Sequence, residues 1–349
     1  MESTETQKTP RSGIFTPTQW RWAGLSPLIL VALLMPLWFS DFTLFQFTLA
    51  FIYAISLLGL NLLIGFNGQF SLGHGAFYAI GAYTAAIMLD HFEIHYGWTI
   101  PAGGLVCFVA GFLFGFPALR IKGHYLALAT LALALATPQL LKYHAFEEWT
   151  GGVQGVVLDK PEAPWGLPLN PDQWLYYLTL VVMGIAFLLA WNLINSRSGR
   201  AMRAIRDHPM AAESMGINTS RYKTVTFGIS AMYTGVAGAL SASVVQFVAP
   251  DSFTVILSIT FVVGSVVGGL ASVSGALFGG LFIQFIPNLA DVISKAAPWA
   301  IYGVFLIFFM LVMPAGIAGT LRMAGLRLLG LLGGADGTSK ASSQTKLQQ

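Results

Sequence analysis

Residues 65–75 combine four glycines with side chains that can hydrogen-bond a small molecule. The polar residues are Asn67, Gln69, Ser71 and His74. Amides, a hydroxyl and an imidazole donate and accept hydrogen bonds, whereas no carboxylate or thiol lies among them to support acid or nucleophilic catalysis. Such a density of glycine disfavours a continuous helix. The segment therefore predicts unwound backbone lined with hydrogen-bonding groups.

A second polar stretch, residues 196–223, carries six basic side chains. Three of them recur at every third position: Arg200, Arg203 and Arg206. This spacing predicts a short amphipathic helix that Pro209 ends. Residues 210–215 predict a second short helix, because Gly216 suits the position just after a helix. The charge alone also fits a solvated loop near anionic lipid, so the pattern leaves two interpretations, that loop and a docking element for another protein.

The elements that would position these residues are membrane helices. Of the 349 residues, 55% are hydrophobic and 9% are charged, whereas soluble domains carry about 25% charged residues. This composition excludes a soluble fold. Apolar runs of about 20 residues are long enough to cross a hydrocarbon core about 30 Å thick. We therefore expect an all-α polytopic membrane protein in a lipid bilayer.

Ten apolar runs separated by polar breaks are expected to span the membrane. In chain order they are 23–39, 43–64, 72–89, 98–119, 123–141, 174–195, 224–248, 253–270, 274–290 and 298–313. An even number of spans places both termini on the same side. Residues 65–75 then connect the second and third spans, and residues 196–223 connect the sixth and seventh.

The charges are sorted between the two sides of this topology. With a cytoplasmic N-terminus, 15 of the 18 basic residues face the cytoplasm, whereas ten of the 15 acids lie outside. The three basic residues outside are Lys142, Lys160 and Lys295. Because basic loops are retained on the cytoplasmic side, this partition predicts cytoplasmic N- and C-termini.

Three regions follow from the predicted topology. They are a cytoplasmic N-terminal segment at 1–22, a transmembrane domain at 23–319 and a cytoplasmic tail at 320–349. The end of the tail, residues 333–349, is rich in Gly, Ser and Gln and is expected to be disordered. The polar N-terminal segment lacks the pattern of a cleavable signal peptide, so the first span is expected to target the chain.

Several classes of function are excluded by what the spans lack. No acidic or basic residue lies in the middle of a predicted span, whereas ion-driven carriers use buried carboxylates or histidines there. The chain has no phosphate-binding GxxxxGK[ST] loop, and its one cysteine, Cys107, provides neither a disulfide nor a cysteine metal site. A net charge of +3 does not indicate nucleic acid as a partner. We expect no catalysis, no cofactor and no metal, and uphill movement of a solute would need energy from another polypeptide.

Residues 65–75 have two interpretations on this basis. Unwound backbone at membrane depth is tolerated only where it lines a cavity or is buried in protein, which favours a permeation path. The alternative is an ordinary inner turn whose polar side chains are all bonded. His74 by itself is typical of a hydrogen-bonded structural histidine.

Four sequence blocks resemble the LivM-type permeases of branched-chain amino acid ATP-binding-cassette (ABC) importers. They follow one another as in that family: Gly59–Tyr83, Lys122–Ala132, Gly199–Asn218 and Met313–Gly319. Together they extend over most of the chain. The resemblance implies a multi-pass permease in the inner membrane of a bacterium or archaeon, with no enzymatic activity of its own.

The resemblance also implies partners and roles. A LivM-type permease pairs with a LivH-like permease, binds two cytoplasmic ABC ATPase subunits and receives solute from an extracytoplasmic binding protein. ATP hydrolysis then drives the two permeases between outward-open and inward-open states. The block Arg200–Gly216 is thereby identified as the ATPase-coupling element, with these residues: Arg200, Arg203, Arg206, Asp207, Ala211, Ala212, Glu213 and Gly216. The expected substrate-pathway residues are Asn67, Gln69, Ser71, His74 and Tyr125.

One departure from the family concerns the outer loop, 142–173. In the motif Thr150–Val156, Gln154 stands where many relatives have Asp. The family also transports urea, short amides and other hydrophobic or aromatic acids, so these solutes are alternatives to the expected branched-chain or hydrophobic amino acid. A stand-alone solute channel is the competing class. It also explains glycine-rich spans without buried charge, but it leaves the paired helices of 196–223 without a role.

Overall fold

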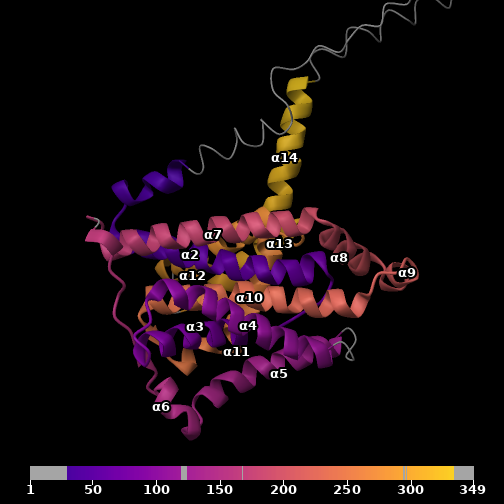
Figure 1. Cartoon of the computed structure of the whole chain (residues 1–349). Helices are drawn as coiled ribbons and strands as arrows, with labels where there is room; N and C mark the ends of the chain where they lie inside the picture. Colours follow the sequence, from indigo (N-terminus) through magenta and orange to yellow (C-terminus); the bar gives the residue numbers. More distant parts are fainter. Residues whose placement is uncertain (1–29, 119–123, 167, 294, 296, 334–349) are drawn as a thin grey trace, which may run out of the picture.

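The computed structural model describes residues 30–118, 124–166, 168–293, 295 and 297–333. Most of these residues form long helices that run side by side (Figure 1). The predicted N-terminal segment 1–22 and the last 16 residues of the predicted tail, 334–349, lie outside the described residues. The all-α polytopic prediction is confirmed.

The first half of the chain contains six helices and a π-helical turn, η1. In order they are 30–38, α2 (Asp41–Asn61), η1 (Leu62–Phe66), α3 (His74–Asp90), α4 (Tyr96–Ala118), α5 (His124–Leu141) and α6 (Glu147–Thr150). The second half continues with α7 (Pro171–Asn195), α8 (Arg197–Asp207), α9 (Pro209–Ser214), α10 (Thr219–Val245), α11 (Val255–Gly268), α12 (Val273–Ile293), α13 (Pro298–Val312) and α14 (Gly316–Gly333). Short 3-10 turns occur at His144–Phe146, Pro164–Gly166 and Pro250–Phe253.

Six helical stretches in the described part of the chain are long and apolar enough to cross a membrane, and a bent pair makes up to seven. The six are Asp41–Phe66, Tyr96–Phe116, Pro171–Asn195, Thr219–Val245, Val273–Ile293 and Ala300–Gly325, and the bent pair is Tyr125–Leu141 with His144–Thr150. The predicted count of ten is therefore not confirmed. Helices α3 and α11, with 17 and 14 residues, are shorter than a full span. Part of the first predicted span, residues 23–29, is outside the described residues.

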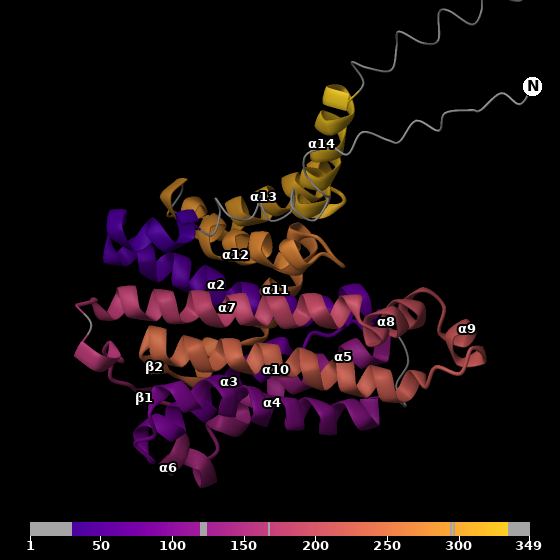
Figure 2. The same ribbon diagram turned by 45° about the horizontal axis from the view of Figure 1, so that its top comes forward.

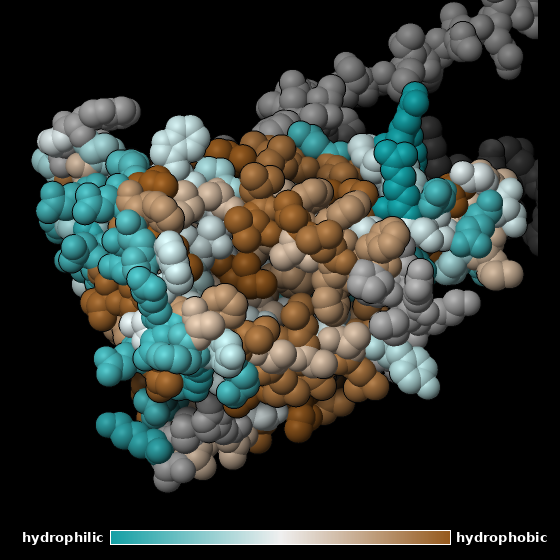
Figure 3. Space-filling view, turned by 60° about the horizontal axis from the view of Figure 1, so that its bottom comes forward, coloured by the Kyte–Doolittle hydropathy of each residue, from teal (hydrophilic) through white to brown (hydrophobic). Residues whose placement is uncertain are grey.

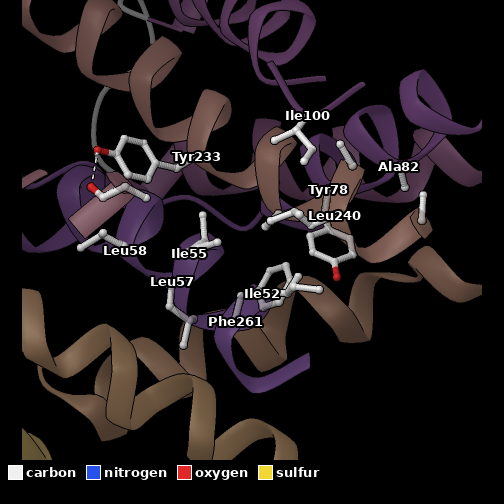
Figure 4. Packing of buried hydrophobic residues seen from close by; sticks show 14 of the residues in the cluster. Ile52, Ile55, Leu57, Leu58, Tyr78, Ala82, Ile100, Tyr233, Leu240 and Phe261 are labelled. Atoms are coloured by element: carbon white, nitrogen blue, oxygen red, sulfur yellow. Dashed lines mark hydrogen bonds between the residues drawn. The ribbon is translucent and has the colours of Figure 1, made fainter. Parts of the chain in front are cut away.

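The core is built around α2 and α10, whose spans are 83% and 72% buried. Aliphatic residues of α2 pack against aromatic rings of α3 and α11, including Tyr78 and Phe261 (Figure 4). The hydroxyl of Tyr233 on α10 donates a hydrogen bond to the carbonyl of Ala186 on α7, at 3.0 Å. Helix α2 is apolar on all sides, which suits a helix surrounded by other helices.

The two ends of the helix bundle differ from its middle. Helices α8 and α9 lie at one end, and α6, β1 and β2 lie at the other (Figure 2). Hydrophobic side chains gather over the middle of the face in Figure 3, with hydrophilic residues toward both ends. This distribution is typical of a membrane protein, whose apolar band faces lipid.

The end that carries α6 contains a minimal sheet. Strand β1 (Val156–Val157) pairs antiparallel with β2 (Phe247–Val248), and Val156 lies opposite Val248. Two ion pairs hold the outer loop to the helices, Lys142 with Asp251 at 2.5 Å and Lys160 with Asp172 at 2.6 Å. The loop thus forms a small folded feature on the bundle.

Helix α14 lies at the boundary predicted between the transmembrane domain and the tail. It begins at Gly316 and continues past residue 319 to Gly333, and it projects away from the bundle (Figure 1). The first part of the predicted tail, up to residue 333, is therefore helical. The three predicted regions themselves stay predictions.

Candidate functional site

The predicted interruption after the second span is confirmed. Helix α2 passes into the π-helical turn η1, residues 67–73 are not helical, and α3 begins at His74. Gly65 leaves no room for a side chain, because a Cβ there would meet Asn61 Oδ1 and the backbone nitrogen of Ala271. Gly68 has φ +71°, which glycine adopts readily. We refer to residues 62–73 as the broken segment.

Asn61, at the end of α2, connects the broken segment to the turn between α11 and α12. Its Nδ2 donates to Ser272 O at 2.7 Å and to Gly269 O at 3.2 Å, and its Oδ1 accepts from the nitrogen of Ala271 at 2.7 Å. Asn61 was not among the predicted site residues. The available signal was an amide side chain near the end of a mostly apolar span, next to the glycine-rich segment.

His74 is part of a buried hydrogen-bond chain. Its Nε2 lies 2.7 Å from Ser230 Oγ, and its Nδ1 lies 3.3 Å from Ser71 Oγ. Because Ser230 donates its single proton to Gly59 O at 2.6 Å, the hydrogen bond to Nε2 requires His74 to donate from that nitrogen. Nδ1 is then the acceptor for Ser71. The structural interpretation of His74 is thus favoured, with both nitrogens engaged.

The two amide side chains of the broken segment differ in their bonding. Gln69 Nε2 donates to Lys223 O at 3.1 Å, near the start of α10. Asn67 is 1% exposed, and within the described part of the chain neither atom of its amide has a hydrogen-bond partner. A buried polar group without a partner is destabilising and rare. Among the predicted pathway residues, Asn67 is therefore the one whose buried amide nitrogen and oxygen are both unpaired in the described part of the chain.

Backbone groups of the broken segment and of the first turn of α3 are bonded to neighbouring helices. The nitrogen of Leu72 donates to Thr130 Oγ1 on α5, and the nitrogen of Gly75 donates to Ser258 Oγ on α11, both at 2.9 Å. Tyr125, the remaining predicted pathway residue, lies apart from the buried group. Its side chain is 72% exposed near the start of α5.

The two predicted helices of residues 196–223 are confirmed as α8 and α9. Ser196 caps α8 by accepting from the nitrogen of Gly199, and His208 caps α9 by accepting from Ala211, both at 3.4 Å. Pro209 begins α9, and Gly216 follows its end with φ +80°. We refer to residues 197–216 as the coupling element.

Of the four arginines of α8, three were predicted site residues, and two of these donate hydrogen bonds within their own chain. Arg203 Nη2 donates to Ile194 O at 3.4 Å, and Arg206 Nη1 donates to Gly65 O at 2.8 Å. Arg206 also pairs with Asp207, at 2.8 Å. Arg200 is exposed. Of the three arginines expected to face the ATPase, Arg203 and Arg206 therefore bond to their own chain, and Arg200 faces outward.

On α9, most of the predicted residues face outward. Ala211, Glu213 and Gly216 are exposed, whereas Ala212 is buried. The carboxylate of Glu213 accepts a hydrogen bond from the hydroxyl of Thr219 at the start of α10. Residues 213 and 216–220 line a shallow, open hollow beside α9.

Met210 and Met215 are the outward residues that sequence reasoning missed. They are 72% and 84% exposed at the tip of the coupling element. Flexible methionine side chains suit protein-binding surfaces. The signal was that these two methionines are the large apolar residues of the short helix predicted at 210–215.

In residues 30–118, 124–166, 168–293, 295 and 297–333, no group of three or more His, Cys, Asp or Glu side chains is placed to hold a metal ion. The basic residues of α8 and of the first turns of α10 belong to helix ends that lie at the end of the bundle opposite α6 (Figure 1).

Comparison with known proteins adds an independent observation. The sequence matches the family described as "Branched-chain amino acid transport system / permease component" over residues 42–314. It is 35% identical over 271 residues, 71% of this chain and 63% of the relative, to the "High-affinity branched-chain amino acid transport system permease protein LivM" of Escherichia coli (strain K12). The chain therefore spans 63% of the length of this relative.

Two further relatives are matched over nearly their whole length. LivH of Escherichia coli (strain K12), a permease protein of the same description, is 29% identical over 294 residues, 78% of this chain and 92% of LivH. BraD of Pseudomonas aeruginosa, also described as a high-affinity branched-chain amino acid transport system permease protein, is 25% identical over 292 residues, 76% of this chain and 91% of BraD. No solved structure matches the chain.

Proposed function

Because the chain belongs to the family of branched-chain amino acid transport system permease components, we propose that it is the membrane permease subunit of an ABC importer. Its solute would be a branched-chain or other hydrophobic amino acid. The observation that carries the proposal is the coupling element, whose tip exposes Met210 and Met215 at the basic end of the bundle. An exposed apolar tip on a short helix is the kind of surface that a partner protein covers.

The proposal assigns energy supply and solute capture to other chains. Two cytoplasmic ATPases would hydrolyse ATP and bind the coupling element, and a LivH-like permease would complete the membrane channel. An extracytoplasmic binding protein would deliver the solute to the opposite end. The chain itself would perform no enzymatic reaction.

The proposed topology has ten spans with both termini in the cytoplasm of a bacterium or archaeon, in the inner membrane. It rests on the sorting of basic and acidic residues between the two sides of the topology predicted from the sequence. Helices α3 and α11, which are shorter than a full span, would then complete their crossings through adjoining non-helical backbone buried in the bundle.

The proposed solute path includes Asn67, Gln69, Ser71, His74 and Tyr125. Asn67 supports this role best, because its buried amide has both a free donor and a free acceptor. Urea, short amides and related small solutes are the alternative cargo, since an amide group could pair with this side chain equally well.

The competing class is a stand-alone solute channel. Co-purification separates the two classes, because an importer subunit is expected to bring down a second permease and an ATPase. A homo-oligomer that conducts solute without ATP would contradict the proposal and support the channel.

A variant of the methionine tip tests the docking surface directly. We expect Met210→Ser combined with Met215→Ser to weaken ATPase association about tenfold or more, the change expected when two exposed apolar side chains stop contacting a partner. Binding would be measured by titrating purified ATPase onto the reconstituted permease. The matched control is Met323→Ser, an exposed methionine on α14. Equal affinities for the two variants would contradict the assignment.

A further inference from the structure

Two hydrogen bonds connect the broken segment to α8 and α10, the two helices that flank α9 and that we call its arms. Arg206, in the last turn of α8, donates from Nη1 to Gly65 O at 2.8 Å. On the other arm, Lys223 near the start of α10 accepts from Gln69 Nε2 at 3.1 Å. Helix α9, with its exposed tip, lies between these arms. A displacement of α9 therefore reaches the broken segment from two sides.

The contact made by Arg206 is both polar and steric. Helix C-termini carry partial negative charge on their last carbonyls, so a guanidinium at Gly65 O is favourable. Asp207 orients that guanidinium, since it accepts from Nε at 2.9 Å. The aliphatic stem lies over Gly68, where an added Cβ would be 3.0 Å from Arg206 Cγ. Arg206 thus holds the backbone of the broken segment at two neighbouring points.

Helix α8 is itself held firmly to α7. Gly199 leaves no room for a side chain beside the backbone of Ile194, and Arg203 donates to the same carbonyl. Met202 and Ile205 are buried. Because α8 has these rigid contacts on one side, it can transmit a displacement through Arg206 rather than absorb it.

Asn67 lies between the two bonded positions, Gly65 and Gln69. It is 1% exposed, and its amide nitrogen and oxygen have no partner among the described residues. A buried amide without partners favours any rearrangement that brings it to water or to another polar group. The adjoining π-helical turn is a form of backbone found frequently at functional sites.

From these contacts we propose that the broken segment is the part of the permease that the coupling element moves. Arg206 is the positioning residue that transmits the movement, and the Asn67 amide gains hydrogen-bond partners when the segment opens. This inference rests on the proposed function for the source of the movement. It assigns Arg206 to a contact within its own chain rather than to the surface that meets the ATPase.

The first test uses the permease alone, as the full chain in membrane vesicles. The single cysteine, Cys107, is buried and is replaced by Ser, so that Asn67→Cys provides one reporter thiol. We expect Arg206→Met to raise the rate at which N-ethylmaleimide labels this thiol about tenfold, as expected when one charge-assisted hydrogen bond no longer opposes local opening. Gln69→Met should also raise the rate.

Two controls separate the proposed contact from general damage. Arg206→Lys should label more slowly than Arg206→Met, because an ammonium group still donates to a carbonyl. Arg200→Met removes an exposed arginine from the same helix and should leave the rate unchanged. Equal labelling in the Arg206→Met and Arg200→Met proteins would overturn the proposal.

The second test uses the complex with its ATPases and a non-hydrolysable ATP analogue. With Arg206 present, we expect the analogue to change the labelling rate of the Asn67→Cys thiol, and we expect Arg206→Met to abolish this response. A response that survives Arg206→Met would overturn the proposed transmission. Failure to recover any ATPase would contradict the proposed function instead, while the result for the permease alone would still decide whether Arg206 holds the broken segment.

Discussion

The broken segment and the coupling element are both polar interruptions between apolar helices, yet they lie in opposite environments. In the broken segment and the start of α3, the side chains of Asn67, Gln69, Ser71 and His74 are at most 8% exposed. At the tip of the coupling element, Met210 and Met215 are at least 72% exposed. These four polar side chains are thus buried and these two methionines are exposed, the reverse of what is usual in a soluble fold.

The difference shows what each interruption can do. The buried one, together with the start of α3, is bonded to α5, α8, α10 and α11, so a change there disturbs several helices at once. In the exposed one, α8 is packed against α7, but the side chains of Met210 and Met215 at the tip face outward and are available to a partner. Substitutions in the broken segment should therefore affect folding, whereas those in α9 should affect association.

The largest effect is expected for Gly65→Val. The new side chain would meet Asn61 Oδ1 and the backbone nitrogen of Ala271, and backbone atoms cannot move aside cheaply. We expect a loss of about 3 kcal/mol of unfolding free energy, measured by reversible unfolding in mixed micelles. Gly184→Val is the matched control, because nothing lies within 4 Å of a Cβ at that position. Similar unfolding free energies for the Gly65→Val and Gly184→Val proteins would contradict the claim that the broken segment is tightly packed.

A smaller effect is expected for Asn61→Leu, which keeps the side-chain size but removes three hydrogen bonds to the α11–α12 turn. Polar contacts between membrane helices contribute modestly, so the expected loss is about 2 kcal/mol of unfolding free energy. The same unfolding measurement applies. Asn192→Leu, at an exposed position of α7, should change stability little. An Asn61→Leu protein as stable as this control would show that the turn is held by packing alone.

The smallest effect on stability is expected for Glu213→Ala. Glu213 is exposed and bonded to Thr219, so its loss should change the unfolding free energy by less than about 0.5 kcal/mol. Solute uptake should nevertheless fall, because the residue lies on the surface proposed to meet the ATPase. Glu162→Ala, an exposed acid of the outer loop, should preserve both quantities. Unchanged uptake in the Glu213→Ala protein would remove Glu213 from the coupling surface.

Both interruptions could be predicted because their causes are local. Glycine density indicated the break after α2, and Pro209 and Gly216 indicated the limits of α9. The directions of the arginines could not be predicted in the same way. Arg200, Arg203 and Arg206 are equivalent in sequence spacing, yet only Arg206 reaches Gly65, which is 141 positions away along the chain.

The number of membrane spans could not be decided from hydropathy alone. Helices α3 and α11 are apolar, but their lengths of 17 and 14 residues depend on where neighbouring helices replace lipid around them. The π-helical turn likewise has no sequence signature of its own. It forms where Gly65 allows Asn61 and Ala271 to approach.

The sequence by itself determined that the chain is a helical membrane protein, that its charges are sorted between two ends and that two polar stretches interrupt its helices. These properties depend on composition and on residues close together along the chain. Only the tertiary structure decided which polar groups are bonded and which are exposed, because Asn61, His74 and Arg206 find partners more than 140 residues away. Such pairing depends on how the helices pack. The same packing leaves Asn67 buried without a hydrogen-bond partner among the described residues and leaves Met215 exposed.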